Sequence, residues 1–551
     1  MPNQQLLDYI QPQKRKWKKT VLIILAIAIF LIIGVIFLPN FLSIFSKDIA
    51  SIDDSDLKLQ KVLILDKDNA YFDLIKIKDV IYEPEDKSQI ILDMVAGKAF
   101  DIKLTVELEV KNEKAFEYFN QAVKKPKYQN PEIADPKKIT PFTDLPYVGF
   151  WRKMARLSAI RSFYLSKLGK DKEAIDEALN SVKIGQKIQE SQVSFIEYLV
   201  AASMREIGLE TLQKIIPSIQ LTSKELKQYI QELDKFYKNE DGLIKVFKGE
   251  FYFQSLVIDS IVSKSVDALK LITGKEYSQK LSERMGNSYY FKLNKTKLLF
   301  AEYARENIKN INAACGEIKD IKMEELTPTN FPQFYIEENV VGKMLYDFLA
   351  VGLTNTIIRK CEEDLLIAAT QAILAIKAFV NDNGNLPLSL NELIPDYLSK
   401  TPNDPFSDQP LKYSTFKKII YSIGKDLQDS GGSEGDDWRK MPDPTFKMNF
   451  SAIPTPSSTI LLLTDALNQG DVEKALDYFD VKAKVLYRDI LIKIKEMGNL
   501  SGLAQELTKA KLISINNNLA KYVIERLENN ETISYFIYFV LEGGKWKLHS
   551  L

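Results

Sequence analysis

The chain has 551 residues, of which 45% are hydrophobic, 11% aromatic and 27% charged, and a chain of this length is expected to hold about three to four domains. Lys and Arg together number 74, and so do Asp and Glu. This balance leaves no net positive field that would attract nucleic acid, so we expect no nucleic-acid partner.

The residue types that are scarce in the sequence argue against several kinds of catalytic and metal site. The sequence has a single histidine, His549, which leaves almost no material for Ser-His-Asp triads or histidine metal sites. Its two cysteines, Cys315 and Cys361, exclude a disulfide framework and a cysteine-rich zinc site but leave room for one bridge between them. The common nucleotide-binding and hydrolase motifs are absent from the sequence. We therefore predict that the protein is not an enzyme.

An uncharged apolar run covers residues 20–38. At a rise of about 1.5 Å per residue it matches the roughly 30 Å hydrocarbon core of a bilayer. Basic residues precede the run and acidic residues follow it: Lys14, Arg15, Lys16, Lys18 and Lys19, then Asp48, Asp53, Asp54 and Asp56. The positive-inside rule then predicts a cytoplasmic N-terminus at 1–19, a single-pass membrane anchor at 20–38 and an extracytoplasmic remainder. A cleaved signal peptide is the competing interpretation, but such peptides have shorter apolar cores and exits with small residues.

Two regions follow the predicted anchor. Residues 50–146 are expected to form a mixed linking region with a strand at Phe100–Val110, where apolar residues alternate. Residues 147–355 show apolar residues at helical spacing, and Thr222 with Glu225 has the pattern of a capping box. Within 147–216, the fragment "SKLGKDKEAIDEALNSVKIG" resembles a tetratricopeptide helical hairpin, although no clean repeat period follows. An irregular bundle of antiparallel helices is the alternative for this domain.

An ordered set of motifs begins near Thr354. A long amphipathic helix is followed by "GNLP", by a short helix expected to be capped by Ser389 and Glu392, and then by "DPF", "PLKY", "IYSIGKD" and a loop rich in Gly and Asp. This order resembles the C-terminal domain of the type II secretion protein G family, the major pseudopilin. The resemblance covers about 360–452, and we place the domain at 356–453. It implies a helix packed on a small antiparallel sheet, with an acidic loop that binds calcium.

The resemblance also implies which residues would bind the ion. Asp426 matches the first family aspartate, Asp436 or Asp437 matches the later one, and Asp429 is an additional local candidate. Calcium takes six to eight oxygen ligands, and glycines let a loop turn sharply enough to direct carboxylates toward one point. A solvated turn without a metal is the alternative. Because the chain lacks a prepilin-peptidase site before its apolar run, we do not expect it to be a filament subunit.

The last region, 458–551, is expected to begin with helices that extend to about residue 511. Three strands should follow, "LAKYVIERL", "ETISYFIYFVLE" and "KWKLHSL", joined by Asn-Asn and Gly-Gly turns. Helices followed by a curled sheet resemble the nuclear-transport-factor-2-like, cystatin-type fold, whose members can hold a small molecule. We expect His549 to be partly exposed near the chain end, with no partner in the interior of the fold.

Together these features predict a multidomain, mainly α protein with α+β C-terminal modules and one N-terminal transmembrane helix. The predicted role is a membrane-anchored extracytoplasmic binding or scaffold protein of the cell envelope, with the helical domain as the surface for a protein partner. One alternative is an accessory component of a type II secretion or pilus-like system. Another is a hydrolase of envelope polymers, which would need two converging carboxylates in a deep pocket.

Overall fold

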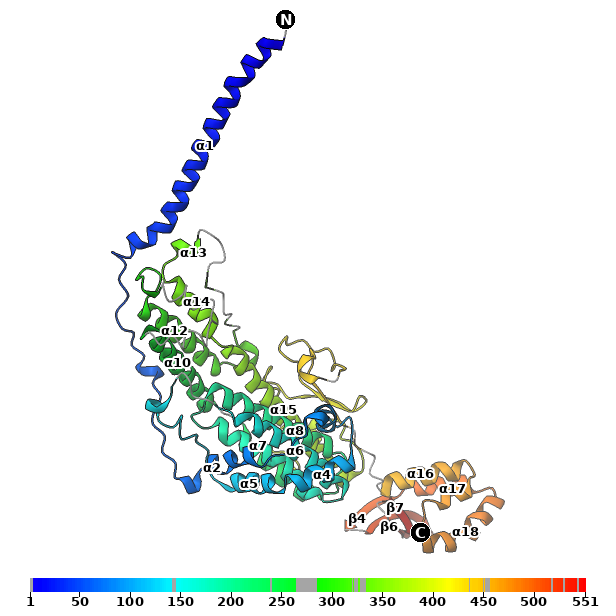
Figure 1. The fold of residues 1–551 in the computed structure, drawn as a ribbon. Helices are drawn as coiled ribbons and strands as arrows, with labels where there is room; N and C mark the ends of the chain where they lie inside the picture. Colours follow the sequence, from blue (N-terminus) through cyan, green and yellow to red (C-terminus); the bar gives the residue numbers. More distant parts are fainter. Residues whose placement is uncertain are drawn as a thin grey trace. The chain divides into compact units, whose positions relative to one another are not determined.

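The computed structural model describes residues 3–140, 145–237, 240–263, 285–319, 321, 326–327, 333–435, 437–448, 450, 456–516, 519–528, 531–542 and 545–551. The chain is mainly helical, with two small antiparallel sheets toward its C-terminus, which confirms the predicted balance of elements (Figure 1). It divides into two compact units. The first comprises residues 1–161, 177–208 and 238–364, and the second comprises 162–176, 209–237 and 365–551.

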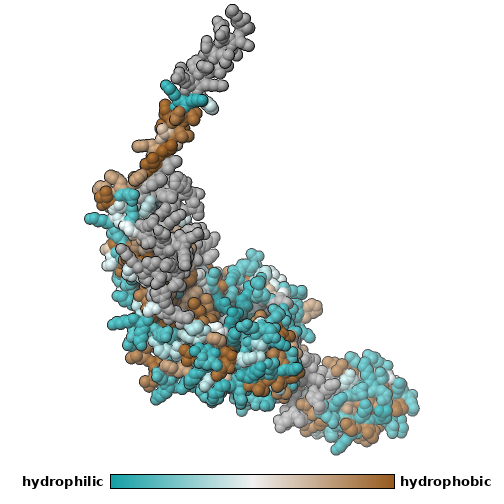
Figure 2. Space-filling model, viewed as in Figure 1, coloured by the Kyte–Doolittle hydropathy of each residue, from teal (hydrophilic) through white to brown (hydrophobic). Residues whose placement is uncertain are grey.

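Helix α1 (Asn3–Leu42) contains the apolar run expected to be the anchor. Its described part displays apolar side chains, and Leu22 and Phe30 are 66% and 76% exposed (Figure 2). Among the described residues, no helix is long and apolar enough to cross a bilayer. The side chains at positions 31, 32, 35 and 36, inside the predicted anchor, lie outside the described residues.

The first unit is built from helices around one buried cluster. Their bounds are α2 (Tyr71–Leu74), α3 (Ser88–Val95), α4 (Ile102–Lys111), α5 (Glu113–Lys124), α6 (Val148–Lys167), α7 (Asp171–Gln189), α8 (Phe195–Ile215), α10 (Glu240–Val262), α12 (Leu293–Ile311), α13 (Gln333–Ile336) and α14 (Val340–Leu349). Helices α6, α7 and α8 continue into the second unit. We call the part of the first unit that surrounds the buried cluster the helical core.

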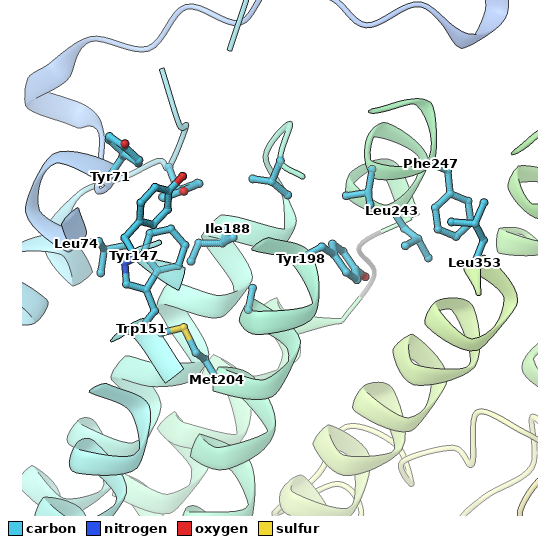
Figure 3. Close-up of a cluster of buried hydrophobic side chains, with 14 of the residues drawn as sticks. Tyr71, Leu74, Tyr147, Trp151, Ile188, Tyr198, Met204, Leu243, Phe247 and Leu353 are labelled. Carbon is cyan, nitrogen blue, oxygen red and sulfur yellow. The ribbon is translucent and has the colours of Figure 1, made fainter. Parts of the chain in front are cut away.

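Aromatic residues fill one end of this core (Figure 3). Trp151 is completely buried, and its ring lies 5.0 Å from that of Tyr147 and 5.7 Å from that of Tyr128. Leu243, Phe247 and Leu353 pack together in another part of the same cluster. The buried cluster consists of large side chains with many close contacts. It is therefore the main source of apolar burial in the first unit.

The predicted strand at Phe100–Val110 is wrong, because these residues form helix α4. The Asp101 carboxylate caps the helix by accepting a hydrogen bond from the Leu104 backbone N–H, and Leu104 and Leu108 are buried one turn apart. The expected linking region is also part of the helical core, since buried residues from Leu57 to Tyr128 belong to the same cluster.

Local signals in the predicted helical domain agree with the structure. The hairpin fragment covers the end of α6 and most of α7, with Gly169 between them at φ 73°, a left-handed conformation that glycine adopts without strain. Thr222 and Glu225 form the predicted capping box at the start of α9 (Ser223–Leu233).

Helix α15 (Leu353–Asn383) confirms the predicted long helix and precedes a small-sheet module, residues 386–450. Strands β1 (Lys412–Ser414), β2 (Ile419–Tyr421) and β3 (Thr445–Lys447) form an antiparallel sheet in that order. Ile420 is completely buried at its centre. The short helix is a single 3-10 turn at Leu390–Leu393, and the Ser389 side chain does not cap it. The Glu392 carboxylate accepts a hydrogen bond from the Leu388 backbone N–H instead.

The C-terminal module, residues 456–551, begins with helices α16 (Pro456–Asn468), α17 (Val472–Leu476), α18 (Val481–Glu496) and α19 (Leu500–Leu507). Strands β5 (Leu519–Glu528), β6 (Glu531–Glu542) and β7 (Lys545–Ser550) confirm the three predicted strands. A fourth strand, β4 (Lys511–Asn516), was not predicted, and the sheet order is β4-β5-β6-β7. Tyr522, Ile537 and Phe539 are buried between this sheet and the helices.

Candidate functional site

The acidic loop joins β2 to β3 and contains several residues in left-handed conformations. Gly424, Gly431 and Gly432 have φ values of 66°, 79° and 84°. At Gly424, an added Cβ would lie 2.0 Å from the Pro442 carbonyl oxygen, so no other residue fits without a shift of the backbone. These glycines give the loop the tight turns that the sequence predicts.

Most of the predicted calcium ligands are held by local partners. Asp426 is exposed and accepts a hydrogen bond from the Gln428 backbone N–H at 3.1 Å. The Asp429 carboxylate accepts hydrogen bonds from Gly431 N–H and the Tyr421 hydroxyl, and it lies 3.4 Å from Lys412 Nζ.

Of the last two predicted ligands, Asp436 and Asp437, the structure describes only Asp437. Asp437 caps the 3-10 turn Trp438–Lys440 and pairs with Lys440 Nζ at 3.1 Å. Asp436 lies outside the described residues. The structure therefore does not bring the described candidates, Asp426, Asp429 and Asp437, together at one point.

Two buried aspartates that the sequence analysis did not select organise the loop. Asp443 is completely buried, and its Oδ2 accepts hydrogen bonds from the backbone N–H groups of Ser430 and Gly432 at 2.9 and 2.8 Å. Its Oδ1 has no hydrogen-bond partner among the described residues. Asp404 accepts hydrogen bonds from the Ser422 hydroxyl and the Ile423 backbone N–H. Both aspartates precede proline, a local sign of a turn that could have drawn attention to them.

Whether this loop can bind calcium depends on how close together its carboxylate oxygens lie. In the described part of the chain, no three His, Cys, Asp or Glu side chains lie close enough to hold a metal ion. The described carboxylates therefore do not form a calcium site by themselves, and calcium binding remains a prediction. The loop is closed by hydrogen bonds to Asp443 and Asp404.

The end of the loop is fastened to helix α8 of the same unit. Trp438 Nε1 donates a hydrogen bond to the Glu210 carboxylate at 3.0 Å, and the Trp438 ring packs 5.4 Å from that of Phe446. The Arg439 guanidinium lies 4.6 Å above the Trp438 ring and 3.7 Å from Glu210. This contact holds the small-sheet module against a helix and gives the loop a structural role.

Helix α1 continues into an exit segment, Asn40–Ile49, that is hydrogen-bonded to the helical core. Asp48 caps helix α12 by accepting hydrogen bonds from the backbone N–H groups of Asn294 and Lys295, at 2.7 and 3.2 Å. The Asn294 side-chain amide donates to the Ile49 carbonyl, and the Ser288 hydroxyl donates to the Ser43 carbonyl. These bonds join α1 to the core without a free linker.

The charged side chains beside this junction form ion pairs with one another. Glu338 pairs with Lys292 at 2.8 Å and with Lys295 at 2.5 Å, and these ammonium groups lower the pKa of its carboxyl to about 2. The Asn339 side chain accepts hydrogen bonds from the Lys292 backbone N–H and the Thr296 hydroxyl. The junction thus combines a helix cap, an ion-pair cluster and a buried amide.

The helical core buries one complete ion pair. Arg205 Nη1 lies 2.6 Å from Glu363 Oε2, and both side chains are almost fully buried. Gln189 completes the arrangement by donating to Glu363 and accepting from Arg205. Burial raises the pKa of Glu363, and the guanidinium beside it acts in the opposite direction.

A second carboxylate cluster surrounds Arg161. Glu109 and Glu177 lie 3.5 and 4.0 Å from its Nε, and burial raises the pKa of both carboxyls. Ser158 donates a hydrogen bond to Glu177 at 2.7 Å. Because the guanidinium lies beside both carboxylates, this cluster is suited to joining α4, α6 and α7.

The two cysteines are joined. Cys315 and Cys361 form a disulfide with Cα atoms 6.0 Å apart, which ties the segment after α12 to helix α15. The sequence analysis had left this bridge open.

His549 is partly exposed, as predicted, but it does have a partner. Its Nδ1 lies 2.5 Å from Asp480 Oδ2, and the other oxygen of Asp480 caps helix α18 through the Ala483 backbone N–H. These hydrogen bonds together with the histidine lower the pKa of Asp480, while burial acts to raise it.

Comparison of the chain with protein-family models, with curated proteins and with solved structures finds no match.

Proposed function

We propose that this chain is a membrane-anchored, extracytoplasmic scaffold or binding protein of the cell envelope, with no catalytic role. In this proposal α1 is the anchor, its N-terminal end is cytoplasmic, and the helical core presents a surface to a partner protein. The exposed apolar side chains of α1 and the uncharged run at 20–38 support the anchor.

The observation that carries the proposal is the junction between α1 and the helical core. Asp48, which follows α1, caps the N-terminus of α12 in the helical core. The position of α1 therefore constrains the position of the core. Such a connection suits a scaffold that must hold a folded surface at a fixed distance from the membrane, rather than a domain on a loose tether.

The disulfide supports the assigned compartment. Bridges such as Cys315–Cys361 form and persist outside the reducing cytoplasm. With the N-terminus inside, the positive-inside rule places both cysteines on the oxidising side of the membrane.

A stripe on helix α4 supports a partner protein for the helical core. Ile102, Val106 and Val110 follow each other at intervals of four residues and are 53%, 44% and 71% exposed. Residues at this spacing share one face of a helix. Apolar side chains gathered in this way mark a contact surface more often than single exposed ones.

Membrane extraction tests the anchor. Ile24→Lys combined with Ile27→Lys should release the full chain from membranes washed with carbonate, because charge within the apolar run opposes insertion. Ile24→Val with Ile27→Val is the matched control and should stay bound. Retention of the lysine variant would argue against α1 as the anchor.

Photo-crosslinking in intact cells tests the partner surface. A crosslinking residue at Val110 should capture one defined protein, whereas the same residue at Lys224 on α9 should capture none. Equal capture at both positions would remove the α4 stripe from the proposal.

A further inference from the structure

The exit segment exposes a cluster of large apolar side chains. Phe41, Ile44 and Phe45 are 61%, 72% and 71% exposed, and the two phenylalanine rings pack edge to face with centroids 5.7 Å apart. Helix α13 packs on α1 and adds Ile336, which is 40% exposed. We call these four residues the interfacial cluster.

Neutral polar groups border the cluster. The Asn287 side chain donates to Asn40, and the Tyr289 hydroxyl donates to the Ile336 carbonyl. The nearby charges of Glu338, Lys292 and Lys295 are paired with each other. Exposed Lys47 follows Phe45 by two residues, and the Ser46 hydroxyl donates to Glu338. Large apolar side chains bordered by polar, aromatic and charged groups are typical of the boundary between lipid chains and headgroups.

The position of the interfacial cluster in the sequence indicates its depth in the bilayer. The run at 20–38 is about 28 Å long at 1.5 Å per residue, close to the thickness of the hydrocarbon core. Phe41 follows Leu38 by three residues, which places it about 4–5 Å beyond the run. The headgroup layer is roughly 5–8 Å thick on each side. A turn at 43–45 ends α1, with the backbone N–H groups of Ile44 and Phe45 bonded to the carbonyls of Phe41 and Leu42.

We propose that the interfacial cluster lies in the outer headgroup layer of the bilayer, so that the helical core rests directly on the lipid surface. This inference rests on the proposed function, because it takes α1 as the anchor. It adds a second contact with lipid, made by the folded domain itself. The cap formed by Asp48 on α12 ties the chain directly after the cluster to the core.

Site-specific fluorescence in lipid nanodiscs tests the inference. The full chain is placed in phosphatidylcholine nanodiscs with one added cysteine, at Phe45, Ile27 or Lys224, labelled with an environment-sensitive dye. The native cysteines stay in their bridge when no reductant is present. Spin labels on lipid headgroups and aqueous iodide serve as quenchers. Ile44→Cys is a second cluster position in case Phe45→Cys disturbs the fold.

The expected result is a blue-shifted Phe45 label that loses most of its iodide quenching and is quenched by headgroup spin labels. Ile27 should report deep lipid and Lys224 should report water. If Phe45 and Ile44 behave like Lys224 while Ile27 reports lipid, the seating of the core is overturned and the anchor stands. If both cluster positions are protected from iodide and from lipid quenchers, a protein such as a second copy covers them, which also overturns the inference. If Ile27 reports water, the proposed function itself fails.

Discussion

Buried charged side chains in this chain differ in their partners, and the partners decide their effect on stability. Glu363 has Arg205 within hydrogen-bond distance, whereas Glu250 on α10 accepts a hydrogen bond from the Gln254 side chain at 3.3 Å and has no cation beside it among the described residues. A paired carboxylate is stabilised as an anion, and an unpaired one favours its proton. Burial raises the pKa of both carboxyls, so the two residues are tested by different changes: loss of the cation for Glu363 and a change of pH for Glu250.

Burial raises the pKa of Glu250 from 4.5 to about 7. The folded state then binds more protons than the unfolded state between these values, so the free energy of unfolding falls as pH rises through this window and is level above it. We expect Glu250→Gln to remove this slope and to add about 1–2 kcal/mol at pH 8, since the side chain keeps partial exposure. Urea unfolding at pH 5 and pH 8 measures both quantities. An unchanged slope in the variant would assign the pH dependence to another group.

Arg205→Met leaves the Glu363 carboxylate buried without its cation and should cost about 3–5 kcal/mol in urea unfolding. Arg488→Met is the matched control, because its ion pair with Glu473 is exposed and should contribute about 1 kcal/mol or less. Adding Glu363→Met to Arg205→Met should recover much of the loss. Equal costs for the two arginine variants would show that the buried pair has no special weight.

Close approach of helices depends on glycine at several contacts, and Gly208 and Gly249 show the difference between a required glycine and a dispensable one. In Gly208 of α8, an added Cβ would lie 2.7 Å from the Ala178 carbonyl oxygen and 2.7 Å from Val182 Cγ2. Gly249 of α10 is also helical, but an added Cβ there would meet only the Val193 carbonyl oxygen at 3.7 Å. The first glycine permits packing of α7 against α8, and the second has no such requirement.

Gly208→Ala should therefore destabilise the protein by about 1–3 kcal/mol through overpacking. Gly249→Ala should stabilise it by up to about 1 kcal/mol, because alanine is the better helix former. Thermal unfolding of both variants against the parent gives the sign directly. A stabilising Gly208→Ala would mean that α7 and α8 can move apart without cost.

The acidic loop makes a separate prediction about ligands. If calcium binds the folded loop, it should raise the unfolding temperature, and a ligand at about 100 times its Kd contributes about 2.7 kcal/mol. Asp426→Ala should abolish this shift, whereas Asp86→Ala at an exposed site in the first unit should keep it. No shift at millimolar calcium would leave a loop closed by Asp443 and Asp404 alone.

Sequence predicted the elements whose signals are local. The Thr222 capping box depends on neighbouring residues, and the strands β5 to β7 alternate between clear turns. Helix α4 was mistaken for a strand because Ile102, Leu104 and Val106 alternate with polar residues, while the cap from Asp101 favours a helix. The loop aspartate Asp443 was missed because its partners lie more than ten residues away.

For the whole molecule, the central claim is that α1 anchors the chain and that the rest lies outside the cytoplasm. Two observations support this claim: the Asp48 cap ties the segment after α1 to the helical core, and disulfides such as Cys315–Cys361 persist mainly in oxidising compartments. Neither depends on the identity of the partner protein, so the claim can be tested before a partner is known.

Thiol labelling of the full chain in intact cells tests this claim most directly. An impermeant maleimide should label Lys224→Cys without lysis and Lys18→Cys only after lysis, while the parent chain stays unlabelled until its disulfide is reduced. This pattern would establish an inside N-terminus and an exterior core. Labelling of Lys224→Cys only after lysis, or recovery of the chain in the soluble fraction, would contradict the account.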